Sequence, residues 1–221
     1  MNNLSPNMLK VFDKCAYEFF LKYMQKISLP QRSNIFEKGK KIHALASYHL
    51  RGENIEKMEN TLSPDEKNAW ETLKKSKYFD LNILETEYNL TSKVGEYWIG
   101  GRLDAFVTDG ENYYILDYKT GNIPQNAEED FQTIVYLICA DKFLRHKKID
   151  YKSLQFVYLG LKNDKGNKDG EEKIILLDEN TKKHYEEKIA STCQKVNFAL
   201  TSTVFQKNKN LCKTCEYNKI C

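Results

Sequence analysis

The stretch GRLDAFVTDGENYYILDYKTG, residues 101–121, is typical of two strands joined by a turn. Its central residues, Asp109-Gly110-Glu111-Asn112, have the composition of a tight hairpin loop. Positions paired across this turn have residue numbers that sum to 221, so Asp104 is expected opposite Asp117. Lys119 follows Asp117 by two residues and therefore points to the same face of the sheet. Two acids and a lysine are thus predicted to meet on one face of a hairpin.

Two opposed carboxylates repel each other unless a cation lies between them or one of them is protonated. Asp104 and Asp117 are both flanked by apolar residues, which favours a buried or cleft position over an exposed hairpin face. Oxygen ligands with spare positions for water suit Mg²⁺ or Mn²⁺. The hairpin therefore predicts a divalent metal site. Lys119 would orient or help deprotonate an attacking water and offset negative charge on a phosphate.

The rest of the chain alternates helix and strand patterns. Ser5 and Pro6 mark the start of an amphipathic helix pair. Helices are expected at 5–27, 34–51, 64–76, 126–146 and 181–200, and strands at 83–91, 96–107, 112–118, 154–160 and 172–177, with a polar loop at 163–172. This order predicts an α/β fold with a mixed β-sheet flanked by helices. We expect one domain over residues 1–221, with a helical layer (1–80), a core (81–180) and a C-terminal helix with a cysteine-rich segment (181–221).

Composition excludes several classes of protein. No run reaches the roughly 18 apolar residues of a membrane span. The N-terminus lacks the basic start and apolar run of a signal peptide, so a cytoplasmic location is expected. No Gly-rich phosphate loop is present, which argues against nucleotide hydrolysis. The net charge of +3 permits a nucleic-acid partner but does not require one.

The chain has six cysteines, and in the cytoplasm metal binding or burial is expected rather than disulfides. Cys139 and Cys193 lie in apolar or helix-like stretches and are predicted to be buried core thiols. The tail contains Cys212, Cys215 and Cys221 in a C-x2-C-x5-C pattern, which requires a fourth ligand from elsewhere. Four thiolates suit either a 4Fe–4S cluster or Zn²⁺.

The hairpin residues GRLD and ILDYKTG resemble the core of the PD-(D/E)xK nuclease superfamily, in its RecB-like branch. That resemblance implies a restriction-endonuclease-like core and a nuclease site that contains Asp104, Asp117 and Lys119. It also implies that the backbone carbonyl of Tyr118 coordinates the metal. Gln132 and Tyr136 are similar to the Q-x-x-x-Y motif that organises the site and the DNA in this branch.

Two motifs upstream extend the resemblance. Gly39 and His43 are similar to the family's G-x-x-x-H helix, in which the histidine is a metal ligand. Glu85 fits the acidic position of the strand before the hairpin best, and Glu87 on the same strand remains an alternative.

The N-terminal segment around Cys15 resembles the signature of iron–sulfur nucleases of the AddB and CRISPR-associated Cas-four type. Leu4, Ser5, Leu9, Phe12, Cys15, Phe20 and Tyr23 match the pattern, whereas Pro6-Asn7 and Ala16 depart from it. The resemblance implies that Cys15, Cys212, Cys215 and Cys221 hold a 4Fe–4S cluster that joins the N- and C-terminal segments.

The sequence thus predicts an Mg²⁺- or Mn²⁺-dependent deoxyribonuclease. The resemblance favours exonuclease activity on single-stranded DNA, in DNA repair, recombination or CRISPR adaptation. One alternative is a nucleic-acid-binding assembly subunit with protein partners in such a complex and gated or incidental cleavage. Another is a redox sensor that uses the cluster.

Overall fold

The computed structural model describes residues 3–29, 33–161 and 170–221. The helices within these ranges are α1 (Pro6–Lys14), α2 (Ala16–Phe19), the π-helix η1 (Phe20–Met24), α3 (Ser33–Leu50), α4 (Glu56–Glu59), α5 (Pro64–Lys74), η2 (Lys77–Asp80), η3 (Ala127–Glu129), α6 (Phe131–His146), α7 (Glu179–Ser202) and η4 (Lys209–Thr214). The strands are β1 (Asn3–Leu4), β2 (Asn82–Val94), β3 (Tyr97–Thr108), β4 (Asn112–Lys119), β5 (Ser153–Gly160) and β6 (Glu171–Leu176).

The strands form one mixed sheet in the order β1-β3-β4-β5-β6, with β2 on the opposite edge of β3. The pairs β2–β3, β3–β4 and β5–β6 are antiparallel, whereas β4–β5 and β1–β3 are parallel. A helix connects the parallel strands β4 and β5, as a parallel crossover requires. The predicted α/β fold with a mixed sheet is confirmed.

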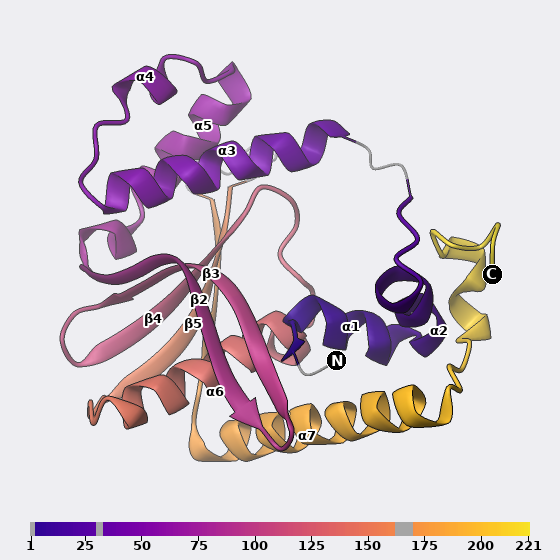
Figure 1. Ribbon diagram of the computed structural model, residues 1–221. Coiled ribbons are helices and arrows are strands. Elements are labelled where there is room, and N and C mark those ends of the chain that lie inside the picture. The colour runs from indigo at the N-terminus through magenta and orange to yellow at the C-terminus, as the bar shows by residue number, and fades with distance from the viewer. Residues whose placement is uncertain (1–2, 30–32, 162–169) are drawn as a thin grey trace.

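Helices cover both faces of the sheet (Figure 1). Phe106 and Ile115 pack with α6, α7 and α1 on one face. Val107 and Leu116 pack with α3 and α5 on the other face. Successive strand residues point to opposite faces, so a strand covered on both sides must be apolar at almost every position. The run Tyr113–Leu116 on β4 fulfils this condition.

The N-terminal segment forms a helix pair, as expected. Cys15 lies between the two helices and separates them. Its extended backbone (φ −163°, ψ 110°) ends α1, and α2 continues directly into η1. The two-residue strand β1 was not predicted. α6 begins at Phe131 rather than at 126, because Asp130 caps its N-terminus by accepting a hydrogen bond from the Gln132 backbone N–H. Most of the predicted loop at 163–172 lies outside the described residues.

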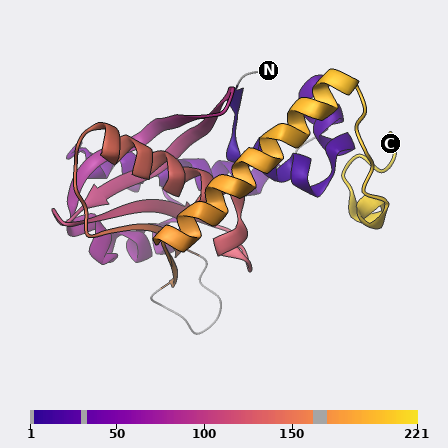
Figure 2. The same cartoon turned by 90° about the horizontal axis from the view of Figure 1, so that it is seen from below.

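The C-terminal segment lies beside the junction of α1 and α2 in both views (Figures 1 and 2). The Tyr17 backbone N–H donates to the Gln206 carbonyl at 3.0 Å, and the Asn208 side-chain amide donates to the Lys14 carbonyl at 3.0 Å.

None of the helices described has the length and apolar character needed to cross a membrane.

Candidate active site

The predicted register of the β3–β4 hairpin is confirmed next to the two acids. Four pairs from Ala105↔Leu116 to Thr108↔Tyr113 follow it. The ladder ends one position before Asp104 and Asp117 would pair. There the Tyr118 backbone N–H donates to Asp104 Oδ2 at 2.8 Å instead. The strands therefore separate at the two acids and leave the second Asp104 oxygen free for other partners.

His43 of α3 lies beside that oxygen. Its Nδ1 is 3.0 Å from Asp104 Oδ1, and its Nε2 is 2.9 Å from the Tyr118 carbonyl oxygen. Both partners are acceptors, so only the doubly protonated imidazolium can donate to both of them. Burial lowers the pKa of His43, but the hydrogen bond to Asp104 and the nearby acidic charges outweigh burial and raise it. The predicted ligands His43, Asp104 and the Tyr118 carbonyl thus converge on one point that favours positive charge.

Glu87 of β2 completes this group. Ligand atoms of His43, Glu87 and Asp104 all lie within 4.8 Å of one another. Thr86 pairs with Ala105 and Tyr88 with Leu103, so Glu87 lies across from Asp104. Glu85, the residue that fits the family pattern best, pairs with Phe106 and is not part of the group. The structure therefore brings the alternative acid, Glu87, to the site.

The β2–β3 hairpin explains why Glu87 takes this position, because the register that starts at Val94↔Tyr97 and continues to Thr86↔Ala105 places Glu87 opposite Asp104. The pairing of β2 with β3 changes by one residue between Ile83 and Glu85, which is a β-bulge. Glu87 itself has φ +49°, an uncommon value for a residue other than glycine. Such irregularities redirect side chains and are common next to functional sites.

The second acid, Asp117, belongs to a closed ring with Lys119 and Gln132. Lys119 Nζ lies 2.7 Å from Asp117 Oδ2 and donates to Gln132 Oε1 at 2.9 Å. Gln132 Nε2 in turn donates to Asp117 Oδ1. The ring holds the Lys119 ammonium beside the acid at a fixed position.

Asp117 is only 4% exposed. Burial, reinforced by the charge of Asp104, raises the pKa of the Asp117 carboxyl, and the charge of Lys119 opposes this. Within the described part of the chain, Asp117 Oδ2 accepts no hydrogen bond of good geometry despite the nearby ammonium. A buried carboxylate oxygen that accepts no hydrogen bond is well suited to act as a metal ligand. His43, Glu87, Asp104 and the Tyr118 carbonyl form a donor set that fits Mg²⁺ or Mn²⁺, whereas the predicted ligand Asp117 lies outside the group whose ligand atoms are all within 4.8 Å of one another.

Tyr136 of α6 contacts the backbone of β3 close to the site. Its hydroxyl donates to the Arg102 carbonyl at 2.9 Å, on the strand that carries Asp104. A Cβ atom added to Gly101 would lie 3.1 Å from this hydroxyl, so the glycine provides the close approach. Gln132 touches Asp117 and Lys119, whereas Tyr136 positions the backbone of β3. The two residues of the Q-x-x-x-Y pattern thus have different tasks.

A groove of about 600 Å³ opens onto the candidate metal-binding group, which is His43, Glu87 and Asp104. One wall is α3, where Gly39 allows the helix to pass close to Thr120: an added Cβ would lie 3.3 Å from the Thr120 hydroxyl. The other wall contains Glu87 and Arg102, whose Nε lies 2.8 Å from Glu87 Oε2. Sequence analysis did not identify the basic and aromatic residues of this groove, which are Lys40, Tyr48, Arg51 and Arg102.

The four predicted cluster ligands also come together. Cys15, Cys212, Cys215 and Cys221 all line one small cavity. The Asn208 backbone N–H lies 3.4 Å from Cys15 Sγ, and the Tyr217 backbone N–H lies 3.4 Å from Cys215 Sγ. Amide donors of this kind favour thiolates and stabilise the sulfur ligands of a metal centre. Cys139 and Cys193 are buried core thiols, as predicted.

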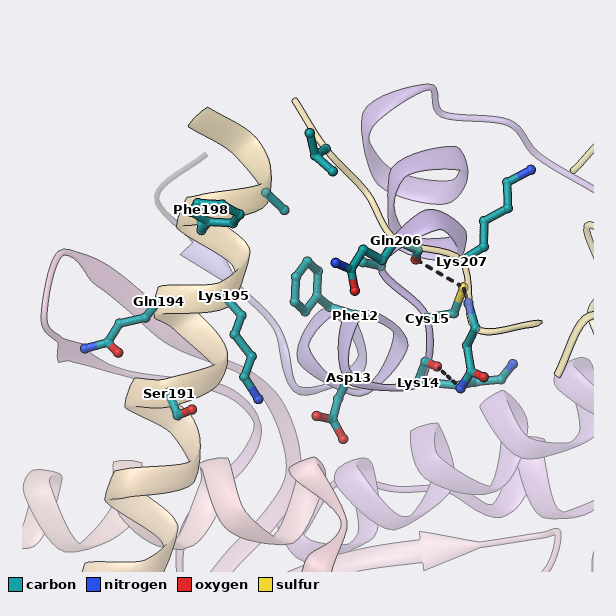
Figure 3. Close-up of a pocket in the computed structure, with 14 residues that line it drawn as sticks. Phe12, Asp13, Lys14, Cys15, Ser191, Gln194, Lys195, Phe198, Gln206 and Lys207 are labelled. Carbon is teal, nitrogen blue, oxygen red and sulfur yellow. Dashed lines mark hydrogen bonds between the residues drawn. The ribbon is translucent and has the colours of Figure 1, made fainter. Parts of the chain in front are cut away.

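A second groove, of about 820 Å³, lies on the other side of Cys15 (Figure 3). In it, Phe198 and Lys195 of α7 face Phe12 and Asp13 of α1. None of its lining residues belongs to the groove along α3. The cysteine-rich end of the molecule thus has a surface separate from the candidate metal site.

Comparison with known proteins gives a family. The model of the PD-(D/E)XK nuclease superfamily matches residues 3–221. A solved structure from Eubacterium rectale, described as a "Putative exonuclease", is similar with a TM-score of 0.67 and 10% identity, over 100% of this chain and 89% of that one. The structure named SSO0001 gives a TM-score of 0.44 and 16% identity, over 100% of this chain and 86% of that one. No curated protein matches. The chain therefore belongs to the PD-(D/E)XK nuclease superfamily.

Proposed function

We propose that this protein is a cytoplasmic, Mg²⁺- or Mn²⁺-dependent deoxyribonuclease that degrades single-stranded DNA from an end. The observation that carries the proposal is the convergence of His43, Glu87 and Asp104 beside the Asp117–Lys119–Gln132 ring. Membership of the nuclease superfamily supports hydrolysis of phosphodiester bonds. Cleavage from a strand end is supported by the similarity of fold to the structure described as a "Putative exonuclease" and by the motifs of the RecB-like branch.

Each residue of the site has a distinct task in this reaction. His43, Glu87, Asp104, Asp117 and the Tyr118 carbonyl would hold the ion. When bound, Mg²⁺ or Mn²⁺ supplies Lewis acidity toward a phosphate oxygen and lowers the pKa of a coordinated water. The Lys119 ammonium lies beside Asp117, where it offsets the negative charge that develops on the phosphate and orients the attacking water. Gln132 holds Lys119 in this position through its side-chain oxygen.

We also propose that Cys15, Cys212, Cys215 and Cys221 hold a 4Fe–4S cluster rather than Zn²⁺. Zinc sites usually pair two C-x2-C motifs, whereas here Cys15 lies almost two hundred residues from Cys212, Cys215 and Cys221. This irregular spacing and the resemblance to iron–sulfur nucleases support the cluster. The cluster would link the N- and C-terminal segments covalently. This link would lower the conformational entropy of the unfolded chain and so stabilise the folded protein.

The cellular setting that the RecB-like resemblance supports is DNA repair, recombination or CRISPR adaptation. A cleavage assay tests the activity itself. Anaerobically purified protein is incubated with 5′- or 3′-labelled single- and double-stranded DNA, with Mn²⁺, Mg²⁺ or EDTA. We expect metal-dependent loss of the single strand from one end and none with Lys119→Ala. Lys152→Ala, which removes an exposed lysine beside Glu111 at the opposite end of β4 from Lys119, is the matched control and should retain activity. DNA binding without cleavage under every metal condition would favour the assembly subunit instead.

A further inference from the structure

We propose that Tyr48 of α3 and Arg51, the residue that follows α3, form a binding subsite for an unpaired nucleobase, next to the candidate metal site. This inference rests on the proposed nuclease function and specifies how the substrate strand is recognised. It assigns a task to a pair of side chains that neither the core nor the metal-binding group uses.

The two faces of α3 have different partners. Ile42, Leu45 and Ala46 are fully buried in the core beneath the helix. Lys40, Ser47 and Arg51 are seven and four residues apart, so they form one stripe along the groove. His43 lies on one side of this stripe and Tyr48 on the other. The groove face of a single helix therefore carries a metal-binding residue and an aromatic side chain together.

Tyr48 and Arg51 are paired and accessible. Tyr48 is 37% exposed, and the Arg51 guanidinium carbon lies 4.9 Å from the centre of its ring. Arg51 Nε donates to Glu53 Oε1 at 2.8 Å, which fixes the orientation of the guanidinium. An aromatic ring and a guanidinium plane are the two groups on which proteins stack unpaired bases. The pair is a preformed stacking platform.

The charges around the platform suit the backbone of a nucleic acid. Lys40 has no ion-pair or hydrogen-bond partner among the described residues and faces the groove. Across from it, Arg102 exposes 66% of its side chain while it pairs with Glu87. Lys40 and Arg51 are eleven residues apart, about 16 Å at a rise of about 1.5 Å per residue. Cationic groups therefore lie on either side of the metal-binding group, where they can contact successive phosphates.

The platform selects single strands because a base within a duplex is already stacked on its neighbours. An unpaired base can stack on Tyr48 while a phosphate of the same strand lies near His43. A blunt duplex can offer only its phosphates to Lys40 and Arg102. The expected result is a preference for single strands that depends on Tyr48.

Binding is tested without cleavage in the Lys119→Ala protein. Short single strands carry one 2-aminopurine, moved base by base along the sequence, and its fluorescence reports stacking. We expect quenching at one register. Adding Tyr48→Ala should abolish that quenching and weaken binding about tenfold, whereas Tyr48→Phe should retain both. Phe198→Ala removes an aromatic side chain that is 69% exposed and lies on α7, outside the groove along α3, and it should change neither. Quenching that survives Tyr48→Ala would overturn the subsite.

Cleavage separates this proposal from the nuclease proposal. With Lys119 intact, Tyr48→Ala should lower kcat/KM about tenfold on a base-bearing strand and leave kcat/KM on a strand of abasic residues unchanged. Equal losses on both strands would overturn the subsite. If the unaltered protein cleaves neither strand, the nuclease proposal fails. The fluorescence result on the Lys119→Ala protein still decides whether the base subsite exists.

Discussion

Gln132, in the first turn of α6, donates a hydrogen bond from its side-chain amide to the carboxylate of Asp117 on β4. Its side-chain oxygen accepts a hydrogen bond from Lys119, so one amide fixes both groups. The Asp130 cap sets the position of Gln132 by fixing the first turn of the helix. The start of α6 is therefore part of the candidate active site.

Gln132→Ala should lower kcat about 10- to 100-fold, as expected when a group that orients a metal ligand is lost. KM for single-stranded DNA should change little, because Gln132 contacts Asp117 and Lys119 rather than the groove. Steady-state kinetics with an end-labelled strand measures both. Gln194→Ala on α7 is the matched control and should behave like the unaltered protein. A change confined to KM would contradict the orienting role.

Glu87→Gln should weaken Mn²⁺ binding by at least about tenfold, because it removes one charged ligand from the group. Glu85→Gln should leave Mn²⁺ binding unchanged, since Glu85 lies across from Phe106. Isothermal titration of the two variants with Mn²⁺ makes the comparison. The opposite order of effects would show that the strand acid is Glu85.

Cys15→Ser should lose bound iron and acid-labile sulfide, because Cys15 is the one ligand of the proposed cluster that the N-terminal segment supplies. It should also lower the Tm, since the N- and C-terminal segments would then be joined only by non-covalent contacts such as the Tyr17–Gln206 hydrogen bond and the packing of Phe20 on Phe205. Cys193→Ala, in the core, is its matched control and should retain full iron and sulfide. Chemical analysis of anaerobically purified protein distinguishes the two. Zinc in place of iron would contradict the proposed cluster.

Asp141→Asn should lower the free energy of unfolding by about 3 kcal/mol at pH 7. Asp141 is 1% exposed and pairs with Lys182 at 2.8 Å and Arg145 at 2.7 Å. Burial raises the pKa of Asp141, but these cations and a hydrogen bond from Tyr151 outweigh burial and lower it. The stabilisation is therefore complete above the unfolded pKa of about 4 and is lost as the pH falls through the folded value.

Urea denaturation at several pH values tests this dependence. The difference in stability between the Asp141→Asn variant and the unaltered protein should shrink as the solution is acidified below about pH 4. Asp150→Asn changes an exposed acid close to the C-terminal end of α6 and should have little effect at any pH. A difference that stays constant down to low pH would exclude the charge of Asp141 as its source.

The sequence predicted the hairpin register because a short turn fixes the pairing of both strands, as Ala105↔Leu116 shows. It did not resolve Glu85 from Glu87, because alternation places both acids on one face of the strand, and only the pairing of β2 with β3 decides which of them lies opposite Asp104. The strand β1 has only two residues, too few to show any periodicity. Tyr48 and Arg51 also escaped prediction, since their position depends on how α3 crosses β2 and β3. Local pattern predicts elements, whereas packing between distant elements builds the groove.

The contact between Cys15 and the segment around Asn208 has a consequence for how the protein is made. Contacts between residues so far apart in sequence form late, because the intervening chain must first be available to fold. During translation, α1 and α2 leave the ribosome long before residues 206–221 are synthesised. Cys15 therefore remains an exposed thiol until Cys221 has left the ribosome. Assembly of the cysteine site is thus a step that follows synthesis of Cys221, and oxidative conditions during that interval would lower the yield of folded protein.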